Sequence, residues 1–119
     1  MDFGPNLMMK ESKGGNTILH IAAKKSNISA AEMIFKEAPS LCLVQNHNGD
    51  TPFHLAIKEG SSEVLHVMES KKNEALFFKN SEGENPLFLA AESGDETLFN
   101  WFSGKVDYYK ARGERNYEG

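Results

Sequence analysis

The sequence contains an internal repeat, and this repeat constrains the fold more than any other feature. Three aligned segments span residues 15–23, 49–57 and 83–91, and they read GNTILHIAA, GDTPFHLAI and GENPLFLAA. Their first residues, Gly15, Gly49 and Gly83, are equally spaced along the chain. The interval of 34 residues between these glycines is the length of one unit. A unit of this length cannot bury its own apolar face, so tandem units stack and share one core. The spacing therefore predicts a solenoid of stacked units.

Each segment begins with residues that are typical of a helix start. Thr17, Thr51 and Asn85 have short side-chain acceptors, which suit the capping of free backbone N–H groups. Pro52 and Pro86 follow at the first helical position, where a missing N–H is tolerated. We therefore expect each segment to begin an α-helix.

The residues that follow predict the end of each first helix. Alanines at 22, 23, 56, 90 and 91 would let two helices approach closely. Gly60 and Gly94 stand where a left-handed residue ends a helix, and Ser26 occupies that position in the first unit.

A second apolar pattern predicts a second helix in each unit. Residues 30–35, 64–68 and 97–102 have apolar side chains at helical spacing, and we expect Met33 and Met68 among them to fill the core. Asn and Gly in residues 46–49 and 80–83 suit the positive φ of tight turns, so these segments predict outward hairpins. The expected fold is all-α.

The aligned segments resemble the ankyrin signature Thr-Pro-Leu-His-x-Ala, whose period is about 33 residues. The second segment matches best, with Phe53 in place of leucine, while Ile18 replaces proline in the first segment. Asn85 and Phe88 replace threonine and histidine in the third. The resemblance implies an ankyrin-repeat solenoid of stacked helix-turn-helix units with protruding hairpin loops. Its expected parts are an N-terminal extension or partial cap at 1–14 and repeats at 15–48, 49–82 and 83–118.

The tail resembles the two hairpins. Residues 116–119 mirror 46–49 and 80–83, so we expect Gly119 to begin a truncated further repeat. An open repeat end exposes apolar surface. The residues expected to be left partly uncovered are Trp101, Phe102, Tyr108 and Tyr109, and those expected in the N-terminal cap are Leu7, Met8 and Met9.

Residues 15–23, 38–42 and 48–56 are similar to plant ankyrin proteins of the accelerated-cell-death type. In that family the array precedes a C-terminal membrane domain and is associated with defence signalling on the cytosolic side. The resemblance implies a cytoplasmic protein-binding scaffold, or one at the cytosolic face of a membrane. A targeting or regulatory module of a larger enzyme or membrane channel, including a bacterial effector, would carry the same repeats.

Charge and cysteine content argue against several classes of protein. The formal net charge of −4 argues against nucleic-acid binding through phosphate neutralisation. Cys42 is the only cysteine, which excludes an intrachain disulfide and a cysteine-rich metal site. No apolar run reaches about 18 residues, so we expect no membrane contact by these residues, although the full-length protein could carry a membrane domain.

The residues that suggest chemistry have simpler structural explanations. An imidazole at His20 or His54 can join a helix start to a neighbouring hairpin by hydrogen bonds, and we expect packing to replace this bridge at Phe88. Cys42 and His47 lack an identifiable third group or oxyanion donors. The sequence therefore predicts no enzyme, no catalytic residue, no cofactor and no metal site.

The ankyrin resemblance also implies where another protein would bind. The contact positions of the family lie at the hairpin tips and on the outward side of the first helices, along a concave face. Charge on this surface is expected to change from basic in the first repeat to acidic in the third, which would orient a partner. The positions carried over are Asn16, Lys24, Lys25, Gln45, His47, Asn48, Asp50, Lys58, Glu59, Lys79, Ser81, Glu82, Glu84, Glu92 and Ser93.

Overall fold

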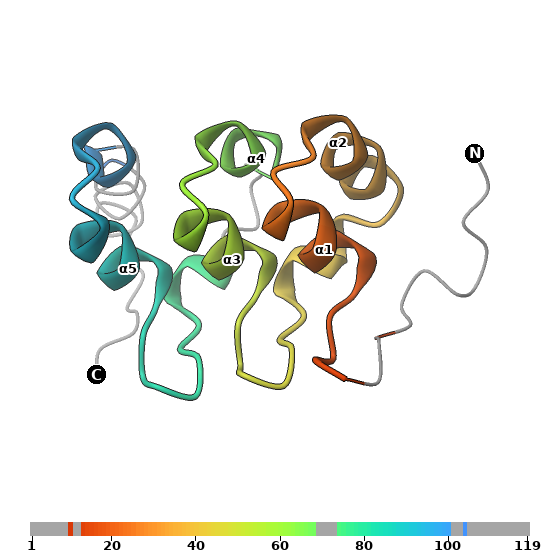
Figure 1. The fold of residues 1–119 in the computed structure, drawn as a ribbon, viewed down its shortest axis with the longest axis horizontal. Helices are drawn as coiled ribbons and strands as arrows, with labels where there is room; N and C mark the ends of the chain where they lie inside the picture. Colours follow the sequence, from red (N-terminus) through yellow and green to blue (C-terminus); the bar gives the residue numbers. More distant parts are fainter. Residues whose placement is uncertain (1–9, 11–12, 69–73, 101–103, 105–119) are drawn as a thin grey trace.

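The computed structural model describes residues 10, 13–68, 74–100 and 104. Three inner helices, α1 (Ile18–Lys24), α3 (Pro52–Lys58) and α5 (Pro86–Ser93), form a row along the molecule. Hairpin loops extend from one side of this row (Figure 1). The outer helices α2 (Ile28–Glu37) and α4 (Ser62–Val67) lie on the other side, and residues 96–100 are also helical. No strand occurs in these residues.

The inner helices begin where the sequence predicts. The side chains of Thr17, Thr51 and Asn85 each accept a hydrogen bond from the backbone N–H three residues later. Pro52 and Pro86 occupy the first turn of α3 and α5. The predicted caps and proline positions are confirmed.

The turns after the inner helices also follow the prediction. Ser26, Gly60 and Gly94 have φ of 53°, 70° and 77°, so all three adopt the left-handed conformation. Within the described residues, Ser26 is the one non-glycine residue with positive φ. The chain therefore reverses in the same way after α1, α3 and α5, although the first unit lacks the glycine.

Two 3₁₀ helices follow the outer helices and were not predicted. They are η2 (Pro39–Leu43) and η3 (Glu74–Phe77). Met68 is fully buried, as expected, whereas Met33 is 45% exposed and its predicted core position is wrong. Helical spacing placed Met33 near the apolar stripe of α2, but the neighbours that cover that stripe leave this side chain at its margin.

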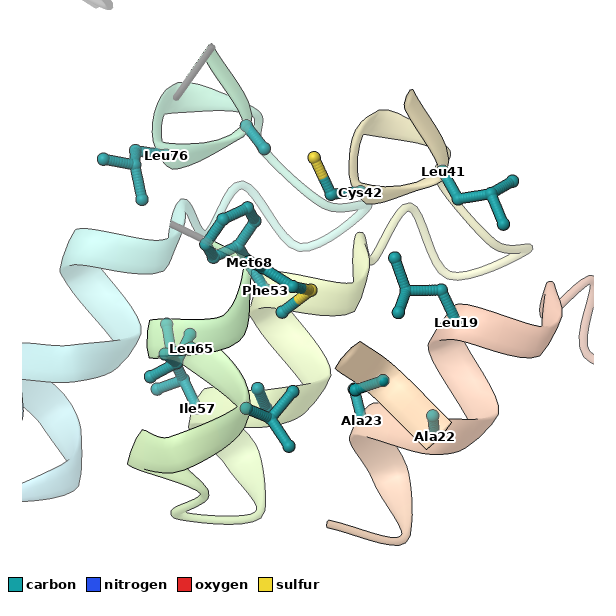
Figure 2. Close-up of a cluster of buried hydrophobic side chains, with 14 of the residues drawn as sticks. Leu19, Ala22, Ala23, Leu41, Cys42, Phe53, Ile57, Leu65, Met68 and Leu76 are labelled. Carbon is teal, nitrogen blue, oxygen red and sulfur yellow. The ribbon is translucent and has the colours of Figure 1, made fainter. Parts of the chain in front are cut away.

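The core lies between the inner helices, the outer helices and the 3₁₀ helices. Each inner helix contacts the next inner helix, α1 and α3 contact their own outer helices, and η2 contacts both α1 and α3. Figure 2 shows this interior, in which Leu19, Phe53 and Leu41 are fully buried. Ala23 and Ala56 are also fully buried, and their small side chains allow the close approach of the helices. Each unit therefore depends on its neighbours for part of its core.

Several predicted features lie outside the described residues. They are the partial cap with Leu7, Met8 and Met9, the open-end aromatics Trp101, Phe102, Tyr108 and Tyr109, and the further repeat at Gly119.

Candidate protein-binding surface

Each described hairpin is closed by one asparagine. The Asn46 N–H donates to the Asp50 carbonyl oxygen at 2.8 Å, and its side-chain oxygen accepts from the backbone N–H of Asn48 and Asp50. Asn80 makes the equivalent bonds with Glu82 and Glu84 one repeat later. These bonds satisfy the backbone polar groups of the turn, so the hairpin keeps its shape without an apolar core of its own.

Neighbouring hairpins are also joined to each other. The Ser81 N–H donates to the Asn48 carbonyl oxygen at 2.9 Å, and the His47 N–H donates to that of Gly14 at 3.0 Å. The amide Nδ2 of Asn46 donates to Asn16 Oδ1 at 2.8 Å, and Asn80 Nδ2 donates to Asp50 Oδ1 at 2.9 Å. We call these bonds between successive hairpins the hairpin ladder.

His20 and His54 connect α1 and α3 to the hairpins that follow them. His20 Nδ1 accepts from the Thr17 backbone N–H at 3.0 Å, and its Nε2 lies 2.9 Å from the Asp50 carbonyl oxygen. His54 repeats this arrangement with Thr51 and with the Glu84 carbonyl oxygen, at the same two distances. The predicted structural bridge is confirmed for both imidazoles.

The bonding partners determine the protonation state of these rings. A backbone N–H only donates and a carbonyl oxygen only accepts, so each ring needs a bare Nδ1 and a proton on Nε2. Burial lowers the pKa of His20 and His54 because desolvation disfavours the charged imidazolium. A proton on Nδ1 would in addition face the N–H of Thr17 or Thr51. Both rings are therefore held neutral, as donors to the next hairpin.

The structure assigns two of the predicted contact residues to the interior. Asn16 is 9% exposed and Asp50 is 1% exposed, and both accept bonds of the hairpin ladder. Asp50 Oδ2 also lies 3.1 Å from Lys58 Nζ. Their side chains are not available to a partner, because they are already bonded beneath the hairpin tips.

We call the surface formed by the hairpins and the inner helices the hairpin face, and the other predicted contact residues belong to these elements or lie directly beside them in the chain. Glu84 is half-buried and its Oε1 accepts from Asn80 Nδ2 at 2.8 Å, and Gln45 Nε2 is bonded to the carbonyl oxygens of Gly49 and Lys79. The exposed members of the predicted set are Lys24, Lys25, Gln45, His47, Asn48, Lys58, Glu59, Lys79, Ser81, Glu82, Glu92 and Ser93.

A cleft of about 350 Å³ opens on the hairpin face between the first two repeats. Its lining residues come from the turns, from the segments that enter the inner helices, and from those helices themselves. Four of them, Asn16, Lys24, Asn48 and Asp50, belong to the predicted set. The lining residues that were not predicted are Lys13, Gly14, Asn46 and Leu55.

Comparisons with known proteins agree with this geometry. A family model described as ankyrin repeats (many copies) matches residues 2–56. A chain in the crystal structure of the yeast ribosomal protein Rps3 in complex with its chaperone Yar1 superimposes with a TM-score of 0.75 at 26% sequence identity. The match covers 87% of this chain and 77% of that chain. The comparison with curated proteins found no match.

The fold is an ankyrin-repeat solenoid. Ankyrin repeats are protein-interaction modules and are in general non-catalytic, so the face formed by their hairpins and inner helices is the candidate functional surface.

One position departs from the ankyrin pattern. Phe88 stands where His20 and His54 bridge to the next hairpin, and its side chain is 51% exposed. The hairpin against which this side chain was expected to pack lies outside the described residues, so the expected replacement of the bridge by packing stays a prediction. Asn85 still caps α5 by accepting from the Phe88 N–H at 2.8 Å. The third ankyrin repeat therefore keeps its helix start and lacks the imidazole.

Alignment of the ankyrin repeats accounts for some of the lining residues that were not predicted. Lys13 lies one repeat interval before His47, and Leu55 lies one repeat interval after Ile21. His47 was already a predicted contact, so the repeat offset could have identified Lys13 from the sequence alone. Leu55 gave no such signal, because an apolar residue inside a helix is usually assigned to the core.

The remaining reactive groups do not form a site within the described residues. Cys42 is 3% exposed and packs in the core of the ankyrin array. In the part of the chain that is described, no group of three or more His, Cys, Asp or Glu side chains could hold a metal ion. None of the described helices is long and apolar enough to cross a membrane.

Proposed function

We propose that this chain is a non-catalytic scaffold that binds another protein through its hairpin face. One observation carries the proposal. The buried polar groups beneath the hairpins bond to one another, whereas the side chains at the tips and on the inner helices remain exposed around a cleft. Such a surface is rigid before a partner arrives, which reduces the entropy lost on binding.

The solved structure that contains the matching chain supports a protein partner, since it holds a ribosomal protein in complex with its chaperone. The charge pattern supports the same conclusion. Lys24 and Lys25 lie at one end of the hairpin face, and Glu82 and Glu92 lie at the other. A partner of mixed charge would be oriented by this pattern.

We further propose a cytosolic setting, in the array of a plant defence-signalling protein. The support is the similarity of residues 15–23, 38–42 and 48–56 to plant ankyrin proteins of the accelerated-cell-death type. Expression of the intact protein in plant cells, with a fluorescent tag, tests this setting directly. A secreted protein or one confined to an organelle lumen would contradict it.

The experiment for the binding function reverses charges at one end of the hairpin face. After a partner has been captured with the intact protein, its affinity is measured for the wild type and for Glu82→Lys/Glu92→Lys. Glu84 is left unchanged because its carboxylate bonds Asn80. The matched control is Glu32→Lys/Glu37→Lys, which makes the same charge change at exposed positions of α2.

We expect the first variant to bind its partner at least about tenfold more weakly, which is about 1.4 kcal/mol. The control should bind like the wild type, and both should retain the helical circular dichroism spectrum. Equal affinity in all three proteins would remove the hairpin face from the proposed function.

A further inference from the structure

The lysines at the ends of the first two inner helices differ in whether a carboxylate neutralises them. Lys58 Nζ lies 3.1 Å from Asp50 Oδ2. Lys24 is the equivalent lysine one repeat earlier, and the equivalent of Asp50 is Asn16, which carries no charge. Within the described part of the chain, no carboxylate lies within salt-bridge distance of Lys24. The first repeat therefore presents an unneutralised ammonium where the second has an ion pair.

This ammonium lines the cleft of about 350 Å³ between the two repeats. Lys13 lines the same cleft and adds a second positive charge. The one carboxylate of the lining, Asp50, is balanced by Lys58 and also accepts from Asn80 Nδ2 at 2.9 Å. The cleft thus has an excess of positive charge, together with an apolar contribution from Leu55.

We propose that this cleft binds an acidic segment of the partner protein, with an aspartate or glutamate carboxylate accepting a hydrogen bond from the Lys24 ammonium. The inference rests on the proposed function and specifies the chemistry of the partner at one end of the hairpin face. A charge-assisted bond of this kind is stronger than a neutral one, and the concave lining reduces its exposure to solvent.

The charge pattern favours a polypeptide over other anions. Exposed Glu82 and Glu92 lie in the third repeat of the same solenoid, so the hairpin face changes sign along its length. A nucleic acid or an anionic membrane is negative throughout and would be repelled there. A polypeptide can place its acidic residues over the first two repeats alone, and the repulsion then fixes its direction.

The test uses the full chain and a fluorescein-labelled peptide of alternating glutamate and leucine, with a lysine and leucine peptide as the control. Binding is measured by fluorescence anisotropy at low ionic strength and by ¹H–¹⁵N NMR titration. The acidic peptide should bind more tightly than the basic one, and its affinity should fall as salt is added. The largest amide shifts should occur at Gly14, Lys24 and Asn48.

Two variants separate the role of Lys24 from that of net charge. Lys24→Glu should weaken binding of the acidic peptide at least about tenfold. Asn16→Asp keeps the acceptor for Asn46 and gives Lys24 the carboxylate that Lys58 already has, so it should also weaken binding. Lys36→Glu is the matched control, because it makes the same charge change at an exposed position of α2 outside the cleft and should have little effect.

Several results would overturn the inference. They are the absence of NMR shifts with the acidic peptide, equal affinity for the two peptides, and equal losses in Lys24→Glu and Lys36→Glu. Tighter binding of inorganic phosphate or of phosphatidylserine vesicles than of the peptide would overturn it as well. If only this inference fails, the natural partner still responds to Glu82→Lys/Glu92→Lys but not to Lys24→Glu. If the proposed function fails, the affinity of the natural partner changes neither with Glu82→Lys/Glu92→Lys nor with Lys24→Glu.

Discussion

The turn after α1 provides a direct test of how backbone conformation contributes to the stability of this solenoid. Ser26 has a φ of 53°, whereas glycines occupy the equivalent positions 60 and 94 with φ of 70° and 77°. Ser26 is exposed, so replacement of its side chain disturbs little packing. A Cβ added at Gly60 would meet no atom within 4 Å, so a substitution there is strained through the backbone alone. Ser26→Gly and Gly60→Ser are therefore reciprocal changes.

The expected magnitude follows from two opposing terms. A residue with a Cβ in the left-handed conformation is destabilised by about 1–2 kcal/mol. Replacing Ser26 by glycine removes this destabilisation. Glycine itself lowers the free energy of unfolding by about 0.5–1 kcal/mol, because an unfolded chain with glycine has more conformations to lose on folding. We expect Ser26→Gly to raise the free energy of unfolding by about 1 kcal/mol and Gly60→Ser to lower it by about as much.

The assay is urea denaturation followed by circular dichroism. With an m-value of about 2 kcal/mol/M, each change should move the midpoint by about 0.5 M urea, in opposite directions. Ser26→Ala is the control, since it removes the hydroxyl but keeps the Cβ and should leave the midpoint nearly unchanged. If Ser26→Gly is no more stable than Ser26→Ala, the strain argument is refuted.

Two further predictions concern the imidazoles and the caps of the outer helices. Because burial lowers the pKa of His20 and His54, the unfolded chain binds more protons below about pH 6.5. The contribution of the neutral imidazoles to the free energy of unfolding should therefore be fully present above that pH. It should fall as the pH drops from about 6.5 toward the lowered pKa, by at most about 1.4 kcal/mol per pH unit for each imidazole. Urea titrations at several pH values check this, and His54→Gln should show a shallower pH dependence. Asn27 caps α2 by accepting from the Ala30 N–H at 3.1 Å, whereas the buried Ser61 hydroxyl at the equivalent position of α4 has no partner among the described residues. Asn27→Ala should lower the free energy of unfolding by about 1 kcal/mol, measured as a lower thermal midpoint, while Ser61→Ala should change that free energy by no more than about 0.5 kcal/mol. Equal losses in the two variants would contradict the cap assignment.

The features that the sequence predicts well are those that each repeat determines locally. The caps at Thr17 and Thr51 involve an acceptor and an N–H three residues apart, and the turn at Ser26 follows directly from its alignment with Gly60. The period also placed His20 and His54 at the same point of successive units. This allowed their structural role to be predicted without coordinates.

The features that the sequence did not predict depend on partners in another repeat. Asn16 and Asp50 are polar residues next to a turn and look like surface positions in the sequence. They are buried because Asn46 and Asn80, from the following hairpin in each case, bond to them. Met33 shows the opposite error, since an apolar side chain at helical spacing was assigned to the core while its neighbours leave it exposed.

The hairpin ladder has a consequence for how such a surface can change by substitution during evolution. Its bonds between units use main-chain atoms and buried or half-buried side chains, in which Asn46 and Asn80 donate to Asn16 and Asp50. The side chains of His47, Asn48 and Glu82 remain exposed. Substitutions at those tips can therefore alter which molecule is recognised without breaking the bonds that hold the repeats together. Specificity and foldability are encoded by different atoms of the same loop, so selection can act on one with little penalty to the other.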